Sequence, residues 1–444
     1  IRGANARLTI DEGGTMIAQG PINGNGPNSN LYQLIVDGTL NAQLYVNSTR
    51  IRVGETGVFT TFFAYAPNQT EGWWYQSNRP SIYNITGTIR YGSSGNQNVY
   101  HIPGGYGDLR LTGGGIKTFV GSTNPIIDND FYIASGIDVI ENTLPILIGG
   151  DFTNDGIWVP NVNMVFDGTL DQVITGSASL TFDQNLSIKN NTRTVTLGSQ
   201  DITINGILEI EPNSIFDPGI RNVTLSGNII AEGTLQAGTG TSTFNFAGNT
   251  NIIGSGASFN NVDINTGSSL TGPASDLFSV SGNFTNNGSF NNNNGTVAFN
   301  GAVDQSITET QDITFNNINI NNTNSAWVNV DGDVDLAGSL TLTTSTSRFD
   351  ADGSGSGIFT LKSTALNQDA RIAELPSPTN FRGDVSVERY IDGVADETIN
   401  WRYMAVPITN ANDGMWQNTF PVTGNFSNPS TSSPETSDIN PDSA

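Results

Sequence analysis

The chain holds little of the chemistry that enzymes use. Its only histidine is His101, in the run Tyr100-His101-Ile102-Pro103, and it has no cysteine. Glycan-cleaving enzymes built on parallel β-helices need converging carboxylates with a basic residue, or paired acids near an exposed histidine. No paired acids neighbour His101 in the sequence. We therefore expect a structural or solvent-facing histidine and predict no catalytic residues.

The densest acidic residues are Asp331, Asp333 and Asp335, whose spacing matches the first ligands of a calcium-binding loop. The sixth position of such a loop would be Leu336 instead of glycine, and the twelfth Leu342 instead of glutamate, so the EF-hand pattern fails. The three aspartates are kept as a candidate site for a loosely bound surface Ca²⁺. No other cofactor is expected.

Aromatic residues gather near the start of the chain, at Tyr65, Trp73, Trp74, Tyr75 and Tyr83. Flat apolar rings with polar rims bind the faces of sugars, which makes these five a candidate glycan-binding group. The competing interpretation is that the rings cover the end of a repetitive core that would otherwise be exposed to water. We favour capping and keep glycan binding as the alternative.

The tripeptide Arg382-Gly383-Asp384 matches a sequence that some adhesion receptors recognise. Its glycine opens an expected strand at residues 383–390. We therefore expect a turn that leads into a strand.

Composition excludes two classes of partner. The chain of 444 residues has 41 acidic and 17 basic residues, for a net charge of −24. Binding to nucleic acid or to an anionic membrane surface requires basic patches, and none is visible in the sequence. No apolar run approaches the ~18 residues of a membrane-spanning helix. The absence of cysteine also rules out disulfides and thiolate metal sites.

A repeated phrase dominates the sequence: Gly, then Asp or Asn, an apolar residue, three further residues, Gly, any residue, and an apolar residue. It begins at Gly150, Gly227, Gly282 and Gly332. A second phrase lies between the copies and begins Phe166-Asp167-Gly168, Phe246-Ala247-Gly248 and Phe299-Asn300-Gly301. The spacing of the first phrase is irregular and fits two or three rungs of roughly 20 to 25 residues in each unit.

Between these phrases almost every segment alternates apolar and polar residues, as in Ile202-Thr203-Ile204 and Val223-Thr224-Leu225. A period of two indicates β-strands, and no convincing helical period is present. Strands of this length with fixed Gly and Asn corners are typical of a stacked solenoid. We predict an all-β protein whose body is a right-handed parallel β-helix, or β-solenoid.

The second glycine of each phrase should occupy a corner. At these positions we expect a positive backbone dihedral or a close approach of two chain segments to exclude a side chain. The residues concerned are Gly156, Gly233, Gly288 and Gly338.

Changes along the chain predict four regions. Residues 1–100 form an N-terminal β region and possible cap, and residues 101–375 the solenoid body. Residues 376–424 form an additional small β module. Residues 425–444 are a tail rich in Ser, Pro and Thr, for which no fold is expected.

Several motifs resemble large repetitive surface proteins of the Bacteroidota. The similarity is carried by residues 106–118, which begin Tyr106-Gly107-Asp108-Leu109, by residues 282–288, and by the Phe-Asn-Asn-apolar-x-Ile segments. Residues 383–391 with Trp401-Arg402-Tyr403 are similar to a module near the C-terminal end of such proteins. The resemblance covers roughly residues 100–410 and implies export by the type IX secretion system.

The resemblance also implies a C-terminal sorting domain, which the sequence up to Ala444 does not contain. At the other end, Ile1 is not preceded by a charged and then apolar leader. We expect either that both segments were removed or that the sequence is part of a longer chain.

These observations predict an extracellular structural or adhesive protein of a bacterial cell surface, without catalytic activity. Its expected partners are components of the type IX secretion system and of the outer-membrane surface, with glycans or surface proteins as further candidates. Two alternatives stay open. One is a carbohydrate-active β-helix enzyme, a polysaccharide lyase or hydrolase, and the other is a subunit or cargo of a surface assembly.

Overall fold

The computed structural model describes residues 7–19, 22, 33–43, 50–62, 82–177, 180–237, 242–355, 357–365, 368–388 and 390. The chain divides into two units, Ile1–Ile391 and Asp392–Ala444. All described residues belong to the first unit. Within them, no helix has the length and hydropathy needed to cross a membrane.

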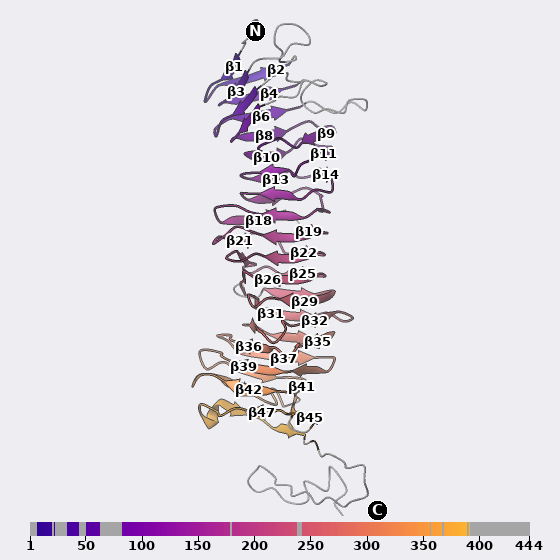
Figure 1. The fold of residues 1–444 in the computed structure, drawn as a ribbon, viewed down its shortest axis with the longest axis vertical. Coiled ribbons are helices and arrows are strands. Elements are labelled where there is room, and N and C mark those ends of the chain that lie inside the picture. Colours follow the sequence, from indigo (N-terminus) through magenta and orange to yellow (C-terminus); the bar gives the residue numbers. More distant parts are fainter. Residues whose placement is uncertain are drawn as a thin grey trace, which may run out of the picture. The chain divides into compact units, whose positions relative to one another are not determined.

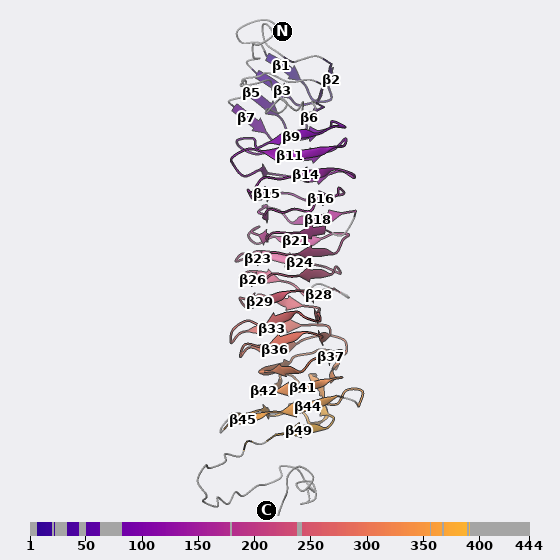
Figure 2. The ribbon, with the colours of Figure 1, turned by 90° about the vertical axis from the view of Figure 1, so that its right-hand side faces the viewer.

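The first unit is a β-solenoid, as the sequence predicted. Short parallel strands stack along one axis, as Figures 1 and 2 show from two sides. In most of the stack, one circuit of the chain contributes three strands to three different sheets, and we call this circuit a rung. One such rung consists of β17 (Met164–Phe166), β18 (Gln172–Gly176) and β19 (Leu180–Phe182).

The first face of the solenoid begins with an 11-stranded parallel sheet and continues through a parallel bridge between Leu235 and Ala257 into a 6-stranded sheet. Its strands are β2 (Thr15–Ala18), β4 (Thr39–Ala42), β6 (Val58–Thr61), β8 (Thr88–Tyr91), β10 (Asp108–Leu111), β13 (Phe131–Ile133), β16 (Phe152–Asn154), β18, β21 (Thr194–Leu197), β24 (Ile215–Asp217) and β27 (Thr234–Leu235), then β30 (Ser258–Phe259), β33 (Leu277–Val280), β36 (Thr296–Phe299), β39 (Asn317–Ile320), β42 (Ser339–Leu342) and β47 (Arg371–Ile372).

The second face is made of three successive parallel sheets. Its strands are β1 (Arg7–Ile10), β3 (Gln33–Val36), β5 (Arg50–Val53) and β7 (Ile82–Ile85), then β12 (Ile126–Ile127), β15 (Ile146–Ile148), β17, β20 (Leu186–Ile188), β23 (Leu208–Ile210), β26 (Ile229–Ala231), β29 (Asn249–Ile253), β32 (Ser269–Thr271) and β35 (Ser289–Asn291), then β38 (Ile313–Phe315), β41 (Asp333–Leu336), β44 (Ile358–Leu361) and β49 (Val385–Val387).

The third face starts later in the chain, with a three-stranded sheet that precedes a 10-stranded one. Its strands are β9 (Gln97–Tyr100), β11 (Ile116–Val120) and β14 (Asp138–Ile140), then β19, β22 (Ile202–Ile204), β25 (Val223–Leu225), β28 (Thr243–Phe246), β31 (Asn261–Ile264), β34 (Phe284–Asn286), β37 (Gln305–Glu309), β40 (Trp327–Val330), β43 (Arg348–Asp350) and β48 (Phe381–Arg382). An antiparallel pair, β45 (Ser363–Ala365) and β46 (Gln368–Asp369), and a short 3-10 helix, η1 (Pro378–Asn380), interrupt the last rungs.

Strand register confirms the predicted rung length. Leu109 pairs with Phe131, Phe131 with Phe152, and Phe152 with Ile174, so that successive rungs add 22, 21 and 22 residues. The sheets also cross the boundaries drawn from the sequence. β8 pairs with β10 across residue 100, and β48 and β49 pair with β43 and β44. The described residues between 7 and 100, and residues 381–387, thus continue the same stack. Residues 391–444, which include most of the predicted C-terminal module and the tail, lie outside the described residues.

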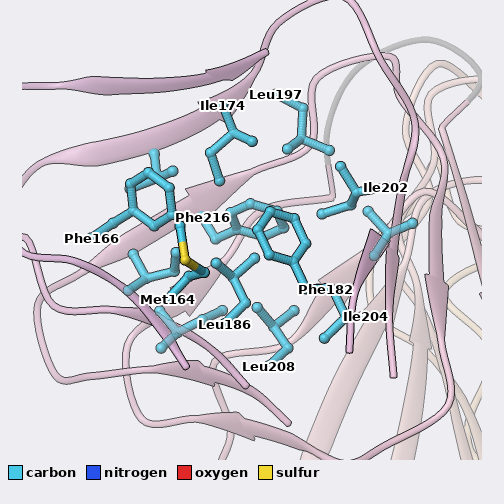
Figure 3. Packing of buried hydrophobic residues seen from close by; sticks show 14 of the residues in the cluster. Met164, Phe166, Ile174, Phe182, Leu186, Leu197, Ile202, Ile204, Leu208 and Phe216 are labelled. Atoms are coloured by element: carbon cyan, nitrogen blue, oxygen red, sulfur yellow. The ribbon is translucent and has the colours of Figure 1, made fainter. Parts of the chain in front are cut away.

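The core follows directly from the alternation. In most strands every second side chain points inward, and the buried apolar residues form one continuous cluster through the stack. Figure 3 shows this packing around Met164, Phe182 and Phe216, where side chains from neighbouring rungs fill the interior. Phenylalanines recur at inward positions and meet edge to face, as Phe259 and Phe278 do at 5.9 Å. Burying each such ring stabilises the fold by about 2 kcal/mol, but only where the next rung covers it.

The Asp or Asn of the repeated phrase connects one rung to the next. The side-chain Oδ1 atom of Asp151 accepts a hydrogen bond from the backbone N–H of Val173 at 2.8 Å. Asn283 accepts in the same way from Ser306 at 2.9 Å. In the fourth phrase the backbone N–H of Asp333 donates to Glu309 on the preceding rung, as the backbone N–H of Asp151 does to Asp130. At these corners, side chains take over the pairing that the short strands leave incomplete.

The corner glycines are required by close approach and not by backbone dihedral. A Cβ at Gly288 would lie 2.4 Å from the carbonyl oxygen of Ser268, on the neighbouring rung. The same approach to a carbonyl oxygen, at 2.3 to 2.4 Å, occurs at Gly156, Gly233 and Gly338. None of the four has a positive φ. Of the two reasons predicted from the sequence, steric exclusion is the one that applies.

We predict that Gly288→Ala lowers the free energy of unfolding by more than ~1 kcal/mol, because the new methyl group forces adjacent rungs apart. Gly272→Ala is the matched control, since the nearest atom to its Cβ would be a ring carbon of Phe278 at 3.3 Å. Thermal and denaturant unfolding of both variants measure the difference. Equal stability of Gly288→Ala and the parent chain would contradict the role assigned to this corner.

Candidate functional site

Of the five aromatic residues in the candidate glycan-binding group, the structure describes only Tyr83. Tyr83 lies in β7, pairs with Ile51 of β5 and packs against the hydrophobic core while half-buried. Tyr65, Trp73, Trp74 and Tyr75 lie outside the described residues. Glycan binding by this group and the capping alternative therefore both stay predictions.

The three aspartates of the candidate calcium site have separate partners. Asp331 accepts a hydrogen bond from the backbone of Ser354 at 3.0 Å, and Asp335 forms an ion pair with Lys362 at 3.3 Å. Asp333 is exposed at the start of β41. Among the residues that the structure describes, no three His, Cys, Asp or Glu side chains are grouped as a metal ion would need. A loosely held Ca²⁺ at these positions stays a prediction.

His101 lies almost wholly inside the protein, with 9% of its surface exposed. Its ring centroid lies 6.1 Å from that of Phe119, and its Nε2 atom lies 3.3 Å from the amide nitrogen of Asn142. Burial lowers its pKa, because the charged imidazolium is poorly solvated there. These contacts, with an amide and an aromatic ring, are those of a packed histidine and not of one exposed at a groove.

Arg382 of the adhesion-like tripeptide is tied to its own solenoid. Its Nε atom donates to the buried carboxylate of Asp350 at 2.7 Å, and its guanidinium lies 3.9 Å from the ring centroid of Trp327. Gly383 follows with a φ of 91°. The segment is a connection between β48 and β49, as the sequence predicted for a turn before a strand.

Two carboxyl groups that the sequence did not bring together share one corner. Asp128 follows β12 and Asp167 follows β17, with one rung between them at Gly149. Two strand spacings correspond to roughly 10 Å. Desolvation raises the pKa of both groups, and the charge of Asp128 further raises the pKa of Asp167. Among the described acids, these two have a raised pKa.

Asp128 and Asp167 are both exposed. A cavity of about 280 Å³ lies elsewhere, where the corners of three later rungs meet. Its lining includes Asn251, Ile253, Thr271, Asp276 and Asn293, and Asp276 is its one ionisable residue. The acids with raised pKa values and the cavity are thus in different places.

Lys117 is a buried lysine with no carboxylate bound to it. It lies in β11 in register with Gln97, and its Nζ atom donates to Gln97 Oε1 at 2.7 Å and to the carbonyl of Ser93 at 2.9 Å. The residue is wholly buried, and desolvation lowers its pKa to about 8. Gln172 and Gln305 occupy similar corners, where their side-chain amides bond to backbone carbonyls. A neutral amide can therefore serve this type of position.

Two arginines on the outer surface have no ion pair with a residue that the structure describes. Arg90 of β8 and Arg110 of β10 are paired in register on adjacent strands of the first face. Both are half-buried and point outward, because their strand neighbours Ile89, Leu109 and Leu111 are in the core. Tyr132 follows in the same register, 6.0 Å from the Arg110 guanidinium.

We call the register Arg90–Arg110–Tyr132 the arginine column. The sequence contains a pattern that indicates this column. Residues 88–91 and 108–111 lie 20 residues apart, about one rung, and both have an arginine at the third position between two apolar or aromatic residues. That signal is recognisable only once the register is known.

Comparison with protein-family models, with curated proteins and with solved structures found no match to this chain. The candidate sites described above must therefore be judged from their own geometry.

The lowered pKa of Lys117 gives a testable pH dependence. Below pH 8 the lysine is charged in both the folded and the unfolded chain. Between about 8 and the ordinary value of 10.5, the folded chain has released this proton and the unfolded chain still holds it. Folding stability contributed by this residue therefore rises with pH across that window.

We expect the parent chain to gain stability relative to Lys117→Gln as the pH rises from 7 to 10. The glutamine replaces the ammonium by a neutral amide, so other titrating groups cancel in the difference between the two proteins. Denaturant unfolding at several pH values measures it. Parallel stability curves for the two proteins would show that Lys117 keeps its charge at all these pH values.

Proposed function

We propose that the protein is an extracellular structural or adhesive element of a bacterial cell surface, with no catalytic activity. The observation that carries this proposal is the continuous first face, in which β2 to β27 join one sheet and β30 to β47 extend it. A one-dimensional stack sets a length by the number of its rungs and presents long flat faces to partners. Structural and adhesive proteins need both properties.

The surface chemistry supports the same role. Asn, Ser and Thr residues provide much of the polar surface, and only 13% of the chain is charged. Such side chains both donate and accept hydrogen bonds, which suits contacts with glycan hydroxyls and with other proteins.

The motifs shared with Bacteroidota surface proteins support export by the type IX secretion system. In this proposal the partners are components of that system and of the outer-membrane surface. Glycans or surface proteins are the molecules that the exposed faces contact.

A non-catalytic role is supported by the separation of the potential catalytic parts. His101 is packed against Phe119, and the pair Asp128 and Asp167 lies on an exposed corner away from the cavity. Glycoside hydrolysis needs two carboxyl groups that face one bound sugar in a site that partly excludes water. These positions do not meet that requirement.

We predict no turnover of polysaccharides. Incubation of the purified chain with plant, algal and bacterial polysaccharides should release neither reducing ends nor unsaturated products, measured beside a lyase and a hydrolase of known activity. Asp128→Asn and Asp167→Asn are the informative variants, because these are the described acids with a raised pKa. Reproducible cleavage that either variant abolishes would overturn the non-catalytic proposal.

A further inference from the structure

The arginine column is an electrostatic anomaly. In-register residues on adjacent strands are close neighbours, and two like charges placed directly opposite each other destabilise a sheet. The chain as a whole has a net charge of −24, so acidic partners are plentiful. Even so, neither Arg90 nor Arg110 has an ion pair with a residue of the described chain.

Most other basic groups in the described ranges are compensated. Arg52 pairs with Asp37, Lys189 with Glu211, and Lys362 with Glu388. Arg193 and Arg221 donate to backbone carbonyls. Arg348, like Arg110, lies near an aromatic ring and has an Nε atom without a hydrogen-bond partner. Arg90 and Arg110 differ from these groups because they are paired in register, with no ion pair to a described residue.

The nearby acids do not provide the missing acceptor. Asp108 lies two residues from Arg110 on the same outward face, but its Oδ2 atom accepts from the hydroxyl of Thr88 at 2.8 Å. Its Oδ1 atom lies 3.4 Å from the backbone N–H of Asp130. The Asp108 carboxylate therefore forms hydrogen bonds with the rungs on either side and is not paired with Arg110.

The local geometry also prepares the guanidinium groups for a ligand. The Nε atoms of Arg90 and Arg110 are enclosed and have no hydrogen-bond partner within the described structure. The side-chain stems are thus packed against the sheet, which reduces the conformational entropy lost when the terminal nitrogens bind. The two guanidinium groups lie one strand spacing apart, at ~4.8 Å. They can bind one oxyanion between them, or two oxyanions that follow each other along a polymer.

We propose that the arginine column binds the carboxylate or sulfate group of an acidic glycan, with the Tyr132 side chain beside the sugar. This proposal names a ligand class for the proposed adhesive role. It rests on that role only for where the protein would meet the glycan. Binding should weaken as salt rises, because salt screens the attraction between the two guanidinium groups and the oxyanion.

The test is binding of the purified full chain to three polymers at about 20 mM ionic strength, where surface charges are weakly screened. Polygalacturonate presents carboxylates, dextran sulfate presents sulfate esters, and unmodified dextran is the neutral control. We expect binding to at least one charged polymer and none to dextran. The polymer that binds identifies the oxyanion.

Arg90→Gln combined with Arg110→Gln should weaken that binding by about ten-fold or more, since both forks are lost. Arg371→Gln is the control for loss of a positive charge away from the column, because it removes one such charge from an exposed position on β47, far along the stack. We expect it to change binding less than two-fold, which is ordinary for a peripheral charge.

A second measurement guards against misfolding. Without ligand, Arg110→Gln removes the repulsion from Arg90, so its melting temperature should equal or exceed that of the parent chain. Failure of the parent chain to bind either charged polymer, or equal weakening by the Arg371→Gln control, would overturn the site. Neither result would bear on the absence of catalysis, which the turnover experiment tests separately.

Discussion

The structure depends on one constraint: a single rung cannot bury its apolar residues alone. Strands of two to five residues present inward side chains that only the rungs above and below can cover. Continuous backbone pairing, phenylalanine contacts between rungs and the Asp and Asn bonds at the corners all act along the same axis. The glycines at Gly156, Gly233, Gly288 and Gly338 are the steric consequence, because close stacking leaves no room for a side chain there.

The same constraint determines where function can be located. Inward positions are committed to packing, so chemistry is left to outward residues in register, to corners and to the ends of the stack. The arginine column is an outward register, and Asp128 and Asp167 share a corner. Lys117 shows the cost of placing a charge inside, since its pKa falls to about 8. A flat face with sparse charged groups is better suited to binding an extended partner than to enclosing a small substrate.

Much of the fold could be predicted from the sequence because its signals are local. The period of two, the Gly and Asn corners and a rung of about 22 residues are all visible in segments such as residues 150–158 and 282–290. The site could not be predicted in the same way, because it depends on register between residues about one rung apart. Nothing local pairs Arg90 with Arg110 or marks Lys117 as buried, and the corner glycines show their carbonyl contacts only when two rungs are placed together.

The central claim is that the described residues between 7 and 390 form one stack in which each rung is stabilised mainly by its neighbours. Hydrogen exchange of the full chain, followed by mass spectrometry, tests it most directly, because exchange reports local opening along the sequence. The account predicts the strongest protection in the central strands, near β17 to β25, and a gradual decrease toward both ends. A sharp internal boundary, such as a block that exchanges independently before residue 100, would contradict a single continuous stack.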